Sequence, residues 1–227
     1  MRVAVCLAPG GCAPGARDTA VVIDVLRATT TLTTAFANGA RAVLPAATVP
    51  EAHALRDRTP GALLCGERDG RKIEGFDLGN SPAEYDAAIV AGRTLVFAST
   101  NGSQAMLAAR AARRTLLGAF VNASAVVRAV GGDAAVTLVC AGKLGRFCLE
   151  DAACAGLLCA RLADRGATLT GPEARMVAAI APRDAAEVRA LVEGAAHARF
   201  LRTLGPAFAA DVLRAATLDA FDRADAV

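Results

Sequence analysis

Short runs of β-branched and other apolar residues alternate with longer alanine- and leucine-rich stretches through the first 165 residues. Runs such as 20–25 (AVVIDV) and 135–140 (AVTLVC) are apolar almost throughout, as strands covered on both faces must be. Because strand-like and helix-like segments alternate, the pattern predicts an α/β fold with a mostly parallel or mixed sheet. The predicted strands are 20–25, 42–45, 62–65, 94–98, 115–119 and 135–140.

Stretches with helical spacing separate these strands, and glycines follow several of them as C-terminal stops. These glycines are Gly39, Gly92, Gly131 and Gly166. The predicted helices are 29–38, 50–57, 82–91, 102–112, 122–130 and 149–165. Helices that alternate with parallel strands cover both faces of the sheet, so we expect a three-layer α/β/α sandwich.

The pattern becomes wholly helical beyond Gly171, with helices predicted at 172–181, 184–204 and 207–216. Val188, Leu191 and Val192 recur at helical spacing, which gives this tail an apolar face. No linker and no internal repeat divides the chain. We therefore expect one α/β domain over 1–227, with a helical tail from about 172 packed on the sheet.

Composition narrows the class of protein. Hydrophobic residues make up 54% and charged residues 21%, which is typical of a compact globular protein. The formal charge is only +3 and there is no tryptophan, so nucleic-acid binding is not predicted. The apolar run 3–8 is too short for a signal peptide, and no stretch is long enough to cross a membrane. We expect a cytoplasmic protein without a membrane partner.

The seven cysteines are odd in number and contain no Cys-x-x-Cys motif. Neither a disulfide framework nor a zinc site is predicted from their spacing. Most of them are expected to be small buried hydrophobes.

One segment, 67–82, mixes acids, bases, glycines and an Asn-Ser pair without any apolar periodicity. Loops on rigid scaffolds commonly carry binding chemistry, so this mixture indicates a site for a charged ligand. The segment holds Lys72, one of only two lysines in the chain; the other, Lys143, lies in a second glycine-rich turn. Because arginine is otherwise preferred, these two ammonium groups are predicted to bind substrate.

Three turns share one pattern, in which a buried strand ends and a helix begins within a few polar residues: 24–31, 99–103 and 140–146. If the strands are parallel, all three turns lie at the carboxyl edge of the sheet, where open α/β folds bind ligands. Helix N-termini with hydroxyls beside them bind anions, and Arg27 can add a bidentate contact. The predicted anion-binding residues are Arg27, Thr29, Thr30, Thr31, Asn80, Ser81, Ser99, Thr100, Asn101 and Gly102. Ordinary helix capping is the alternative for each turn alone.

Carboxylates lie near the same turns. Asp24 ends an otherwise apolar strand, Glu67 and Asp77 lie in the glycine-rich segment, and Glu150 and Asp151 open a helix. Several carboxylates beside an anion site favour Mg²⁺, which takes oxygen ligands and bridges to substrate phosphate. For Glu150 and Asp151, an interaction with the helix dipole is the alternative. The predicted metal ligands are Asp24, Glu67, Asp77, Glu150 and Asp151.

A cysteine-phosphatase mechanism is a rival interpretation, because Cys140 and Arg146 have the Cys-x5-Arg spacing. The residues that flank them lack the usual histidine and hydroxyl. Of the two histidines, His53 is expected at the surface, while the role of His197 stays open.

Four stretches, taken together and in order, resemble the 2-phosphosulfolactate phosphatase family. They are 22–31 (VIDVLRATTT), 66–82 (GERDGRKIEGFDLGNSP), 99–102 (STNG) and 140–151 (CAGKLGRFCLED). The resemblance implies a Mg²⁺-dependent hydrolase that converts 2-phospho-3-sulfolactate to 3-sulfolactate and phosphate, a step of coenzyme M synthesis. It also implies a homo-oligomer, expected to be a dimer. Cys148 departs from the family pattern, which has a serine there.

The resemblance carries a site role onto eleven positions: Asp24, Arg27, Glu67, Lys72, Asp77, Asn80, Ser81, Thr100, Asn101, Glu150 and Asp151. As a hypothesis, some of the carboxylates hold Mg²⁺, Arg27 and the amides around Thr29–Thr31 bind the phosphoryl oxygens, and Lys72 and Lys143 face the sulfonate or carboxylate. The catalytic residues are predicted to be Asp24, Arg27, Lys72 and Glu67. A water molecule is the first choice of nucleophile, and attack by Asp24 is the alternative. Other small anionic phosphate monoesters, or a non-catalytic anion-binding module, are the competing functions.

Overall fold

The structure, a computed structural model, describes residues 1–11 and 14–227. Its larger sheet contains five parallel strands. Their order across the sheet is β7 (Arg114–Gly118), β2 (Thr19–Ile23), β8 (Ala135–Cys140), β1 (Arg2–Cys6) and β9 (Thr168–Leu169). The central strand, β8, and its neighbour β2 are almost entirely buried, which explains their apolar sequences.

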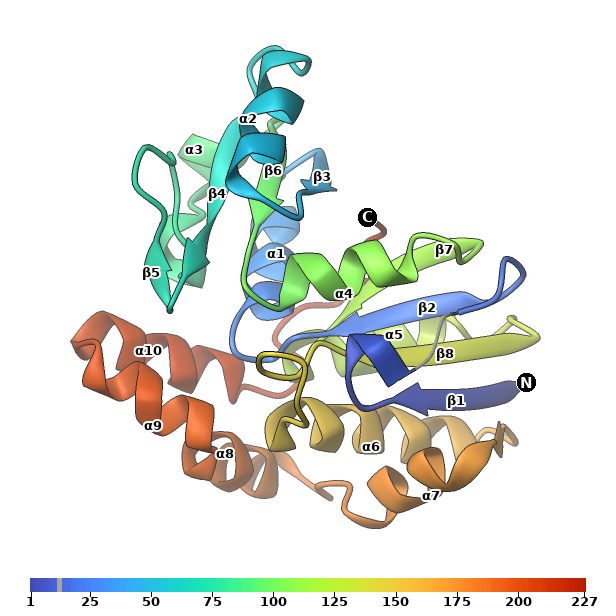
Figure 1. The fold of residues 1–227 in the computed structure, drawn as a ribbon. Coiled ribbons are helices and arrows are strands. Elements are labelled where there is room, and N and C mark those ends of the chain that lie inside the picture. The colour runs from blue at the N-terminus through green and yellow to red at the C-terminus, as the bar shows by residue number, and fades with distance from the viewer. Residues whose placement is uncertain (12–13) are drawn as a thin grey trace.

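A second sheet lies beyond the first (Figure 1). Its order is β3 (Ala42–Pro45), β6 (Thr94–Ala98), β4 (Leu63–Arg68) and β5 (Arg71–Lys72), and only β5 is antiparallel to its neighbour. The prediction of one sheet is therefore wrong in number, although the strands are placed well. Apolar strands alone do not specify their partners, because pairing is decided by long-range packing.

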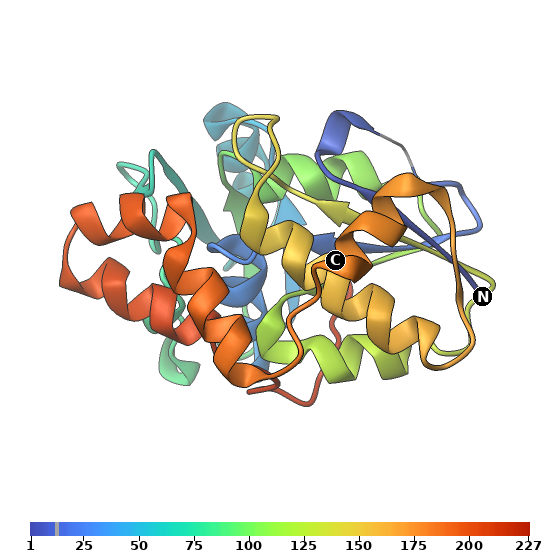
Figure 2. The same cartoon turned by 90° about the horizontal axis from the view of Figure 1, so that it is seen from below.

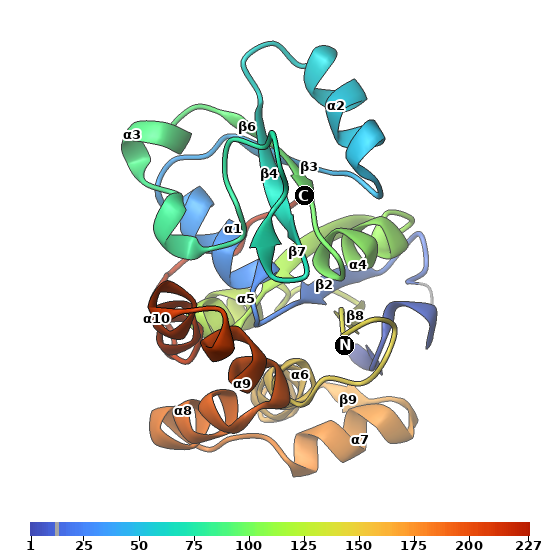
Figure 3. The same ribbon diagram turned by 60° about the vertical axis from the view of Figure 1, so that its left-hand side comes forward.

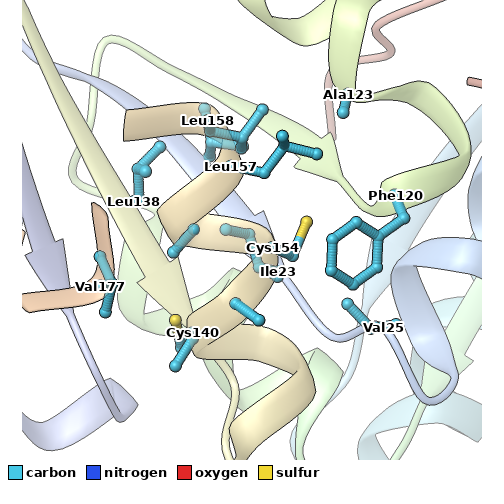
Figure 4. Packing of buried hydrophobic residues seen from close by; sticks show 14 of the residues in the cluster. Ile23, Val25, Phe120, Ala123, Leu138, Cys140, Cys154, Leu157, Leu158 and Val177 are labelled. Carbon is cyan, nitrogen blue, oxygen red and sulfur yellow. The ribbon is translucent and has the colours of Figure 1, made fainter. Parts of the chain in front are cut away.

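Helices form layers on and between the sheets. Helices α1 (Ala28–Ala37) and α4 (Gly102–Ala109) lie between the two sheets and share one hydrophobic cluster with both. The far face of the larger sheet is covered by α5 (Ala123–Ala129), α6 (Leu149–Ala163) and α7 (Gly171–Ala179). Figure 4 shows part of that core, where Leu158 and Cys154 of α6 pack near Ile23 and Phe120. The outer face of the second sheet packs against α2 (Val49–Asp57). The α/β sandwich is confirmed, with a second sheet added to it.

The helical tail consists of α8 (Ala185–Gly194), α9 (Ala196–Thr203) and α10 (Pro206–Ala215). The three helices stand side by side at one end of α6 (Figures 2 and 3). Val188, Leu201 and Val212 belong to the same hydrophobic cluster as the larger sheet, so the tail packs on that core as predicted. The predicted helix 184–204 is interrupted at Ala195, whose backbone is extended.

Several shorter elements differ from the sequence prediction. The predicted helix 82–91 is divided into a 3₁₀ turn, Pro82–Glu84, and α3 (Ala87–Val90), because Asp86 caps a new helix by accepting a hydrogen bond from the Ala88 amide. Strand β1 is an addition to the predicted set. Two further 3₁₀ turns span Pro9–Gly11 and Phe120–Asn122. Among the described residues, no helix is long and apolar enough to span a membrane.

The segment 67–82 begins as a β-hairpin rather than as an irregular loop. Glu67 pairs with Lys72 and Arg68 with Arg71, so the turn consists of Asp69 and Gly70. Both turn residues have positive φ, 51° and 77°. Asp-Gly is a favoured pair for such a two-residue turn, although the sequence pattern predicts a loop for the whole segment.

Candidate functional site

A cavity of about 190 Å³ opens beside the ends of β2, β4, β6 and β8, with α9 forming part of its wall. Its polar lining residues are Asp24, Arg27, Glu67, Asp69, Asn80, Thr100, Asn101, Lys143 and His197. The turns that follow parallel strands therefore meet, as the sequence predicts, but they come from two sheets and not from the edge of one. The apolar part of the lining includes Leu26, Phe200 and Leu201.

Asp24 follows β2 directly and is buried. Its Oδ1 accepts a hydrogen bond from the Ala28 amide at 3.3 Å, and its backbone carbonyl accepts one from the Thr29 hydroxyl at 2.8 Å. Burial, followed by the nearby charge of Glu67, raises the pKa of Asp24 from 3.8 to about 7. The protein therefore stabilises the ionised Asp24 carboxylate poorly, and a cation bound beside it would stabilise that form.

Glu67 and Asp151 each receive two backbone N–H groups. The Glu67 oxygens accept from Thr100 and Gly70, both at 2.8 Å, which ties the β4–β5 hairpin to the turn after β6. The Asp151 oxygens accept from Val25 at 2.8 Å and Gly142 at 3.0 Å, and Asp151 does not line the cavity. Burial, followed by the charge of Asp24, raises the pKa of Asp151. Asp151 therefore joins the turns after β2 and β8.

Glu150 lies in the first turn of α6 and is 1% exposed. His197 Nδ1 is 3.6 Å from its Oε1, and that oxygen lacks a hydrogen-bond partner. Burial acts to raise the pKa of Glu150, but the attraction of His197 and the Cys148 thiol offsets this and holds the pKa below its usual value. Burial and the carboxylates of Asp151 and Glu150 raise the pKa of the Cys148 thiol.

Arg27 lines the cavity but is already engaged. Its Nη1 donates to Asp211 Oδ2 at 2.7 Å and its Nη2 to the Gly70 carbonyl at 2.5 Å. Ser81 donates to the other Asp211 oxygen at 2.6 Å. Both ion-pair partners are at most 3% exposed, so the loop after β2 is fastened to α10 by a buried salt bridge. Arg27 thus has a structural contact that the sequence does not reveal.

Three threonines at the start of α1, Thr29, Thr30 and Thr31, do not form the predicted phosphate site. Their hydroxyls donate to backbone carbonyls of Asp24, Val25 and Asn80, at 2.8, 2.8 and 3.0 Å. All three are fully buried and none lines the cavity. They stabilise the turn that holds Asp24 in place.

Two further predicted residues, Asp77 and Lys72, lie away from the cavity. Asp77 is exposed and its Oδ2 accepts from the Leu64 amide at 2.8 Å, near the start of β4. Lys72 is exposed, and its Nζ lies 3.5 Å from the Asp77 carbonyl. Lys72 and Ser81 line a neighbouring groove that shares Arg27 and Asn80 with the cavity. Lys72 lies on β5, the edge strand of the second sheet, and outside the cavity.

Residues of the turn after β6 have supporting roles. Ser99 and Ser103 exchange backbone-to-hydroxyl hydrogen bonds of 3.0 and 2.9 Å at the start of α4. A Cβ on Gly102 would lie 2.4 Å from the Ala28 Cβ and 2.7 Å from Asp24 Oδ2, so glycine permits α4 to begin against Asp24. Asn101 accepts a hydrogen bond from the Leu144 amide at 2.8 Å, which holds the 142–147 turn beside the cavity.

The cationic and unpaired groups at the cavity complete its chemistry. Lys143 Nζ lies 4.2 Å from the centre of the Phe200 ring. Among the described residues, the buried side-chain oxygens without a hydrogen-bond partner belong to Thr33, Asn80, Thr100 and Glu150. Asn80 and Thr100 line the cavity. Unpaired buried oxygens are costly, so they point to a ligand.

The thiolate alternative lacks support in the structure. Cys140 is fully buried in the hydrophobic core, as Figure 4 shows, and burial raises its pKa. Arg146 is exposed and its backbone pairs with that of Lys143. Neither residue lines the cavity. A buried thiol with a raised pKa is a poor nucleophile.

Three residues that shape the site are not predicted from the sequence: Asp69, Phe200 and Asp211. Asp69 is placed at the cavity by the hairpin turn, for which the Asp-Gly pair is a signal. Phe200 lines the cavity from α9. Asp211 lies 184 positions from Arg27, and nothing in the sequence marks them as partners. His197, whose role the sequence does not decide, lines the cavity.

Comparisons with known proteins identify the family of this chain. The sequence profile of the family described as 2-phosphosulpholactate phosphatase matches residues 11–224. A protein from Thermotoga petrophila, named probable 2-phosphosulfolactate phosphatase, is 48% identical over 160 residues, which cover 70% of this chain and 68% of that protein. A protein of the same name from Clostridium acetobutylicum is 39% identical over 189 residues, covering 82% of this chain and 80% of its own. The chain therefore belongs to the 2-phosphosulfolactate phosphatase family.

Proposed function

We propose that this protein hydrolyses 2-phospho-3-sulfolactate to 3-sulfolactate and phosphate with the help of Mg²⁺. Its relatives are named probable 2-phosphosulfolactate phosphatases, which supports this substrate. The observation that carries the proposal is the cavity itself, which joins buried carboxylates, unpaired neutral oxygens and a lysine at the meeting point of four strand ends. A pure anion-binding module has little use for carboxylates beside its ligand, whereas metal-assisted hydrolysis requires them.

The donor set fits Mg²⁺. Asp24 and Glu67 supply carboxylate oxygens at the cavity, and Asn80 and Thr100 supply neutral oxygens that lack protein partners. Mg²⁺ prefers oxygen ligands and usually keeps several waters, so two carboxylates are sufficient. When bound, the ion would act as a Lewis acid toward the phosphoryl oxygens. Asp77 and Asp151 have no part in this ligand set, because neither lines the cavity.

The remaining groups bind and orient the substrate. Lys143, held over Phe200, is placed to bind the sulfonate or the carboxylate. Arg27 borders the cavity, but its ion pair with Asp211 reduces the charge that it offers. Lys72, outside the cavity, is left out of the proposal. The attacking group is water, which must enter opposite the leaving alkoxide for an in-line displacement.

The test is phosphate release from synthetic 2-phosphosulfolactate by the metal-free protein. We expect release on addition of Mg²⁺, loss with EDTA, and little effect of thiol alkylation, because the described free cysteines are all buried. Parallel assays with 2-phospholactate, which lacks the sulfonate, measure substrate selectivity. Binding of these esters without any phosphate release would instead support the non-catalytic binding module. Faster hydrolysis of 2-phospholactate would support another small phosphate monoester as substrate.

A further inference from the structure

A second group of potential metal ligands lies beside the cavity, and one of its members, His197, lines that cavity. Cys148, Glu150 and His197 each offer one ligand atom, and these atoms all lie within 4.8 Å of one another. This Cys-Glu-His cluster shares no residue with the Mg²⁺ ligands proposed above. Cys148 is the N-cap residue of α6, Glu150 is in the first turn of that helix, and His197 is in the first turn of α9. The cluster therefore joins α6, which packs on the larger sheet, to α9 of the helical tail.

The cluster is buried and electrostatically incomplete. Cys148 is 8% exposed, Glu150 1% and the His197 side chain 13%. Glu150 Oε1 has no hydrogen-bond partner although it is buried. A buried carboxylate oxygen without a hydrogen bond is unusual and calls for an explanation such as an ion. Burial raises the pKa of the Cys148 thiol, and the nearby carboxyl groups of Asp151, Glu150 and Asp24 add to this effect.

The spacing of the cluster suits a small tetrahedral ion. Bond lengths of about 2.0–2.3 Å place the ligand atoms of tetrahedral zinc about 3.3–3.8 Å apart. His197 Nδ1 and Glu150 Oε1 are already 3.6 Å apart. The remaining pairs, all within 4.8 Å, need an approach of about 1.0–1.5 Å at most, which side-chain rotation can supply.

The chemistry of the three groups identifies the ion. A thiolate, an imidazole and a carboxylate are the ligands that Zn²⁺ uses, whereas Mg²⁺ avoids sulfur. We propose that Cys148, Glu150 and His197 form a binding site for Zn²⁺ or a similar thiophilic divalent ion beside the cavity. Three protein ligands leave one tetrahedral position for water. Binding displaces the proton of the Cys148 thiol to solvent.

Cobalt substitution tests the site without any assay of activity. The full-length protein, stripped of metal with a chelator, is titrated with Co²⁺ and then with Zn²⁺ as competitor. We expect a thiolate-to-cobalt charge-transfer absorption that Zn²⁺ abolishes and that excess Mg²⁺ leaves in place. Cys148→Ser should lose this absorption and bind Zn²⁺ at least about tenfold more weakly.

Two further variants distinguish the loss of a metal ligand from misfolding of the protein. Cys154→Ala removes a buried thiol of the same helix that is not in the cluster, and it should keep the absorption. His197→Gln leaves Cys148 intact on its own helix and should also weaken Zn²⁺ binding at least about tenfold. The proposal is overturned if the parent protein shows no thiolate-to-cobalt absorption, if Cys148→Ser retains it, or if His197→Gln binds Zn²⁺ as tightly as the parent.

Discussion

Asp24 holds a carboxyl group that the fold makes difficult to ionise. Burial and the charge of Glu67 raise its pKa to about 7, while the unfolded chain releases the same proton near pH 3.8. Between these values the folded state binds more protons than the unfolded state, so the contribution of Asp24 to stability is lost as pH rises through this window. The Mg²⁺ proposed to bind at the cavity would offset this penalty, because a cation stabilises the ionised carboxylate.

Replacement of Asp24 by asparagine should therefore separate stability from activity. In the presence of EDTA at pH 8, we expect Asp24→Asn to be more stable than the parent by on the order of 2 kcal/mol, or about 4–8 °C in Tm. At pH 4 the difference should vanish, because the parent carboxyl is protonated. Turnover should fall at least about a hundredfold. Thermal melts across this pH range check the expectation, with the exposed Asp57→Asn as control.

Lys143 is the lysine that lines the cavity, and its ammonium group offers one positive charge to the substrate. Loss of a charge-assisted hydrogen bond costs about 1.5–3 kcal/mol, which corresponds to about tenfold or more in binding. Lys143→Met should raise KM for 2-phosphosulfolactate by that factor and change KM for 2-phospholactate little. Lys72→Met, outside the cavity, is the matched control and should leave both values unchanged. Equal increases for both substrates would assign Lys143 to the phosphate or carboxylate instead of the sulfonate.

Helix α4 approaches α1 and Asp24 so closely that only glycine fits at its first residue. A Cβ at Gly102 would overlap with Ala28 and with Asp24 Oδ2. Because the backbone of Gly102 is not in the left-handed region, the cost of Gly102→Ala is steric, about 1–3 kcal/mol of stability. Because the new methyl group displaces Asp24, turnover by Gly102→Ala should fall at least about tenfold. Gly194→Ala is the control, because a Cβ at the end of α8 would meet open space. Normal turnover by Gly102→Ala would show that the close approach of α4 does not position Asp24.

The elements themselves follow from local patterns to different degrees. Strands β3 and β6 coincide with the predicted ranges 42–45 and 94–98, because their apolar runs end at clear polar turns. The hairpin of β4 and β5 escapes prediction, since its strands lack alternation and only Asp69-Gly70 marks the turn. The threonines 29–31 look like anion ligands in sequence, yet their hydroxyls satisfy nearby carbonyls. Hydroxyl-rich helix starts are ambiguous for this reason.

On the scale of the whole molecule, the buried pair of Arg27 and Asp211 fastens the helical tail to the loop after β2. Removal of one partner leaves an uncompensated buried charge, which costs about 3–5 kcal/mol. We expect Asp211→Ala to lose that much stability in denaturant unfolding. The double variant Arg27→Met with Asp211→Leu should recover a large part of it. Glu187→Gln, which breaks an exposed pair with Arg183, should change stability little; an equally small effect of Asp211→Ala would contradict the role of the pair.

The arrangement of the molecule is the part that sequence patterns predict least. The carboxyl edge of the parallel strands is predictable from the alternation of strands and helices, and with it the meeting of Asp24, Thr100 and Lys143. The division into two sheets and the closure of the cavity by α9 depend on contacts between distant residues, such as Arg27 with Asp211 and Glu150 with His197. The predicted dimer, cytoplasmic location and absence of nucleic-acid partners stay predictions.

Metal-dependent phosphate release is the most direct measurement of the central claim. The metal-free parent protein and Asp24→Asn are each supplied with 2-phosphosulfolactate, first in EDTA and then with Mg²⁺ in excess, and inorganic phosphate is followed over time. The account predicts release only by the parent and only with Mg²⁺. Release that proceeds equally in EDTA, or equally in Asp24→Asn, would contradict it.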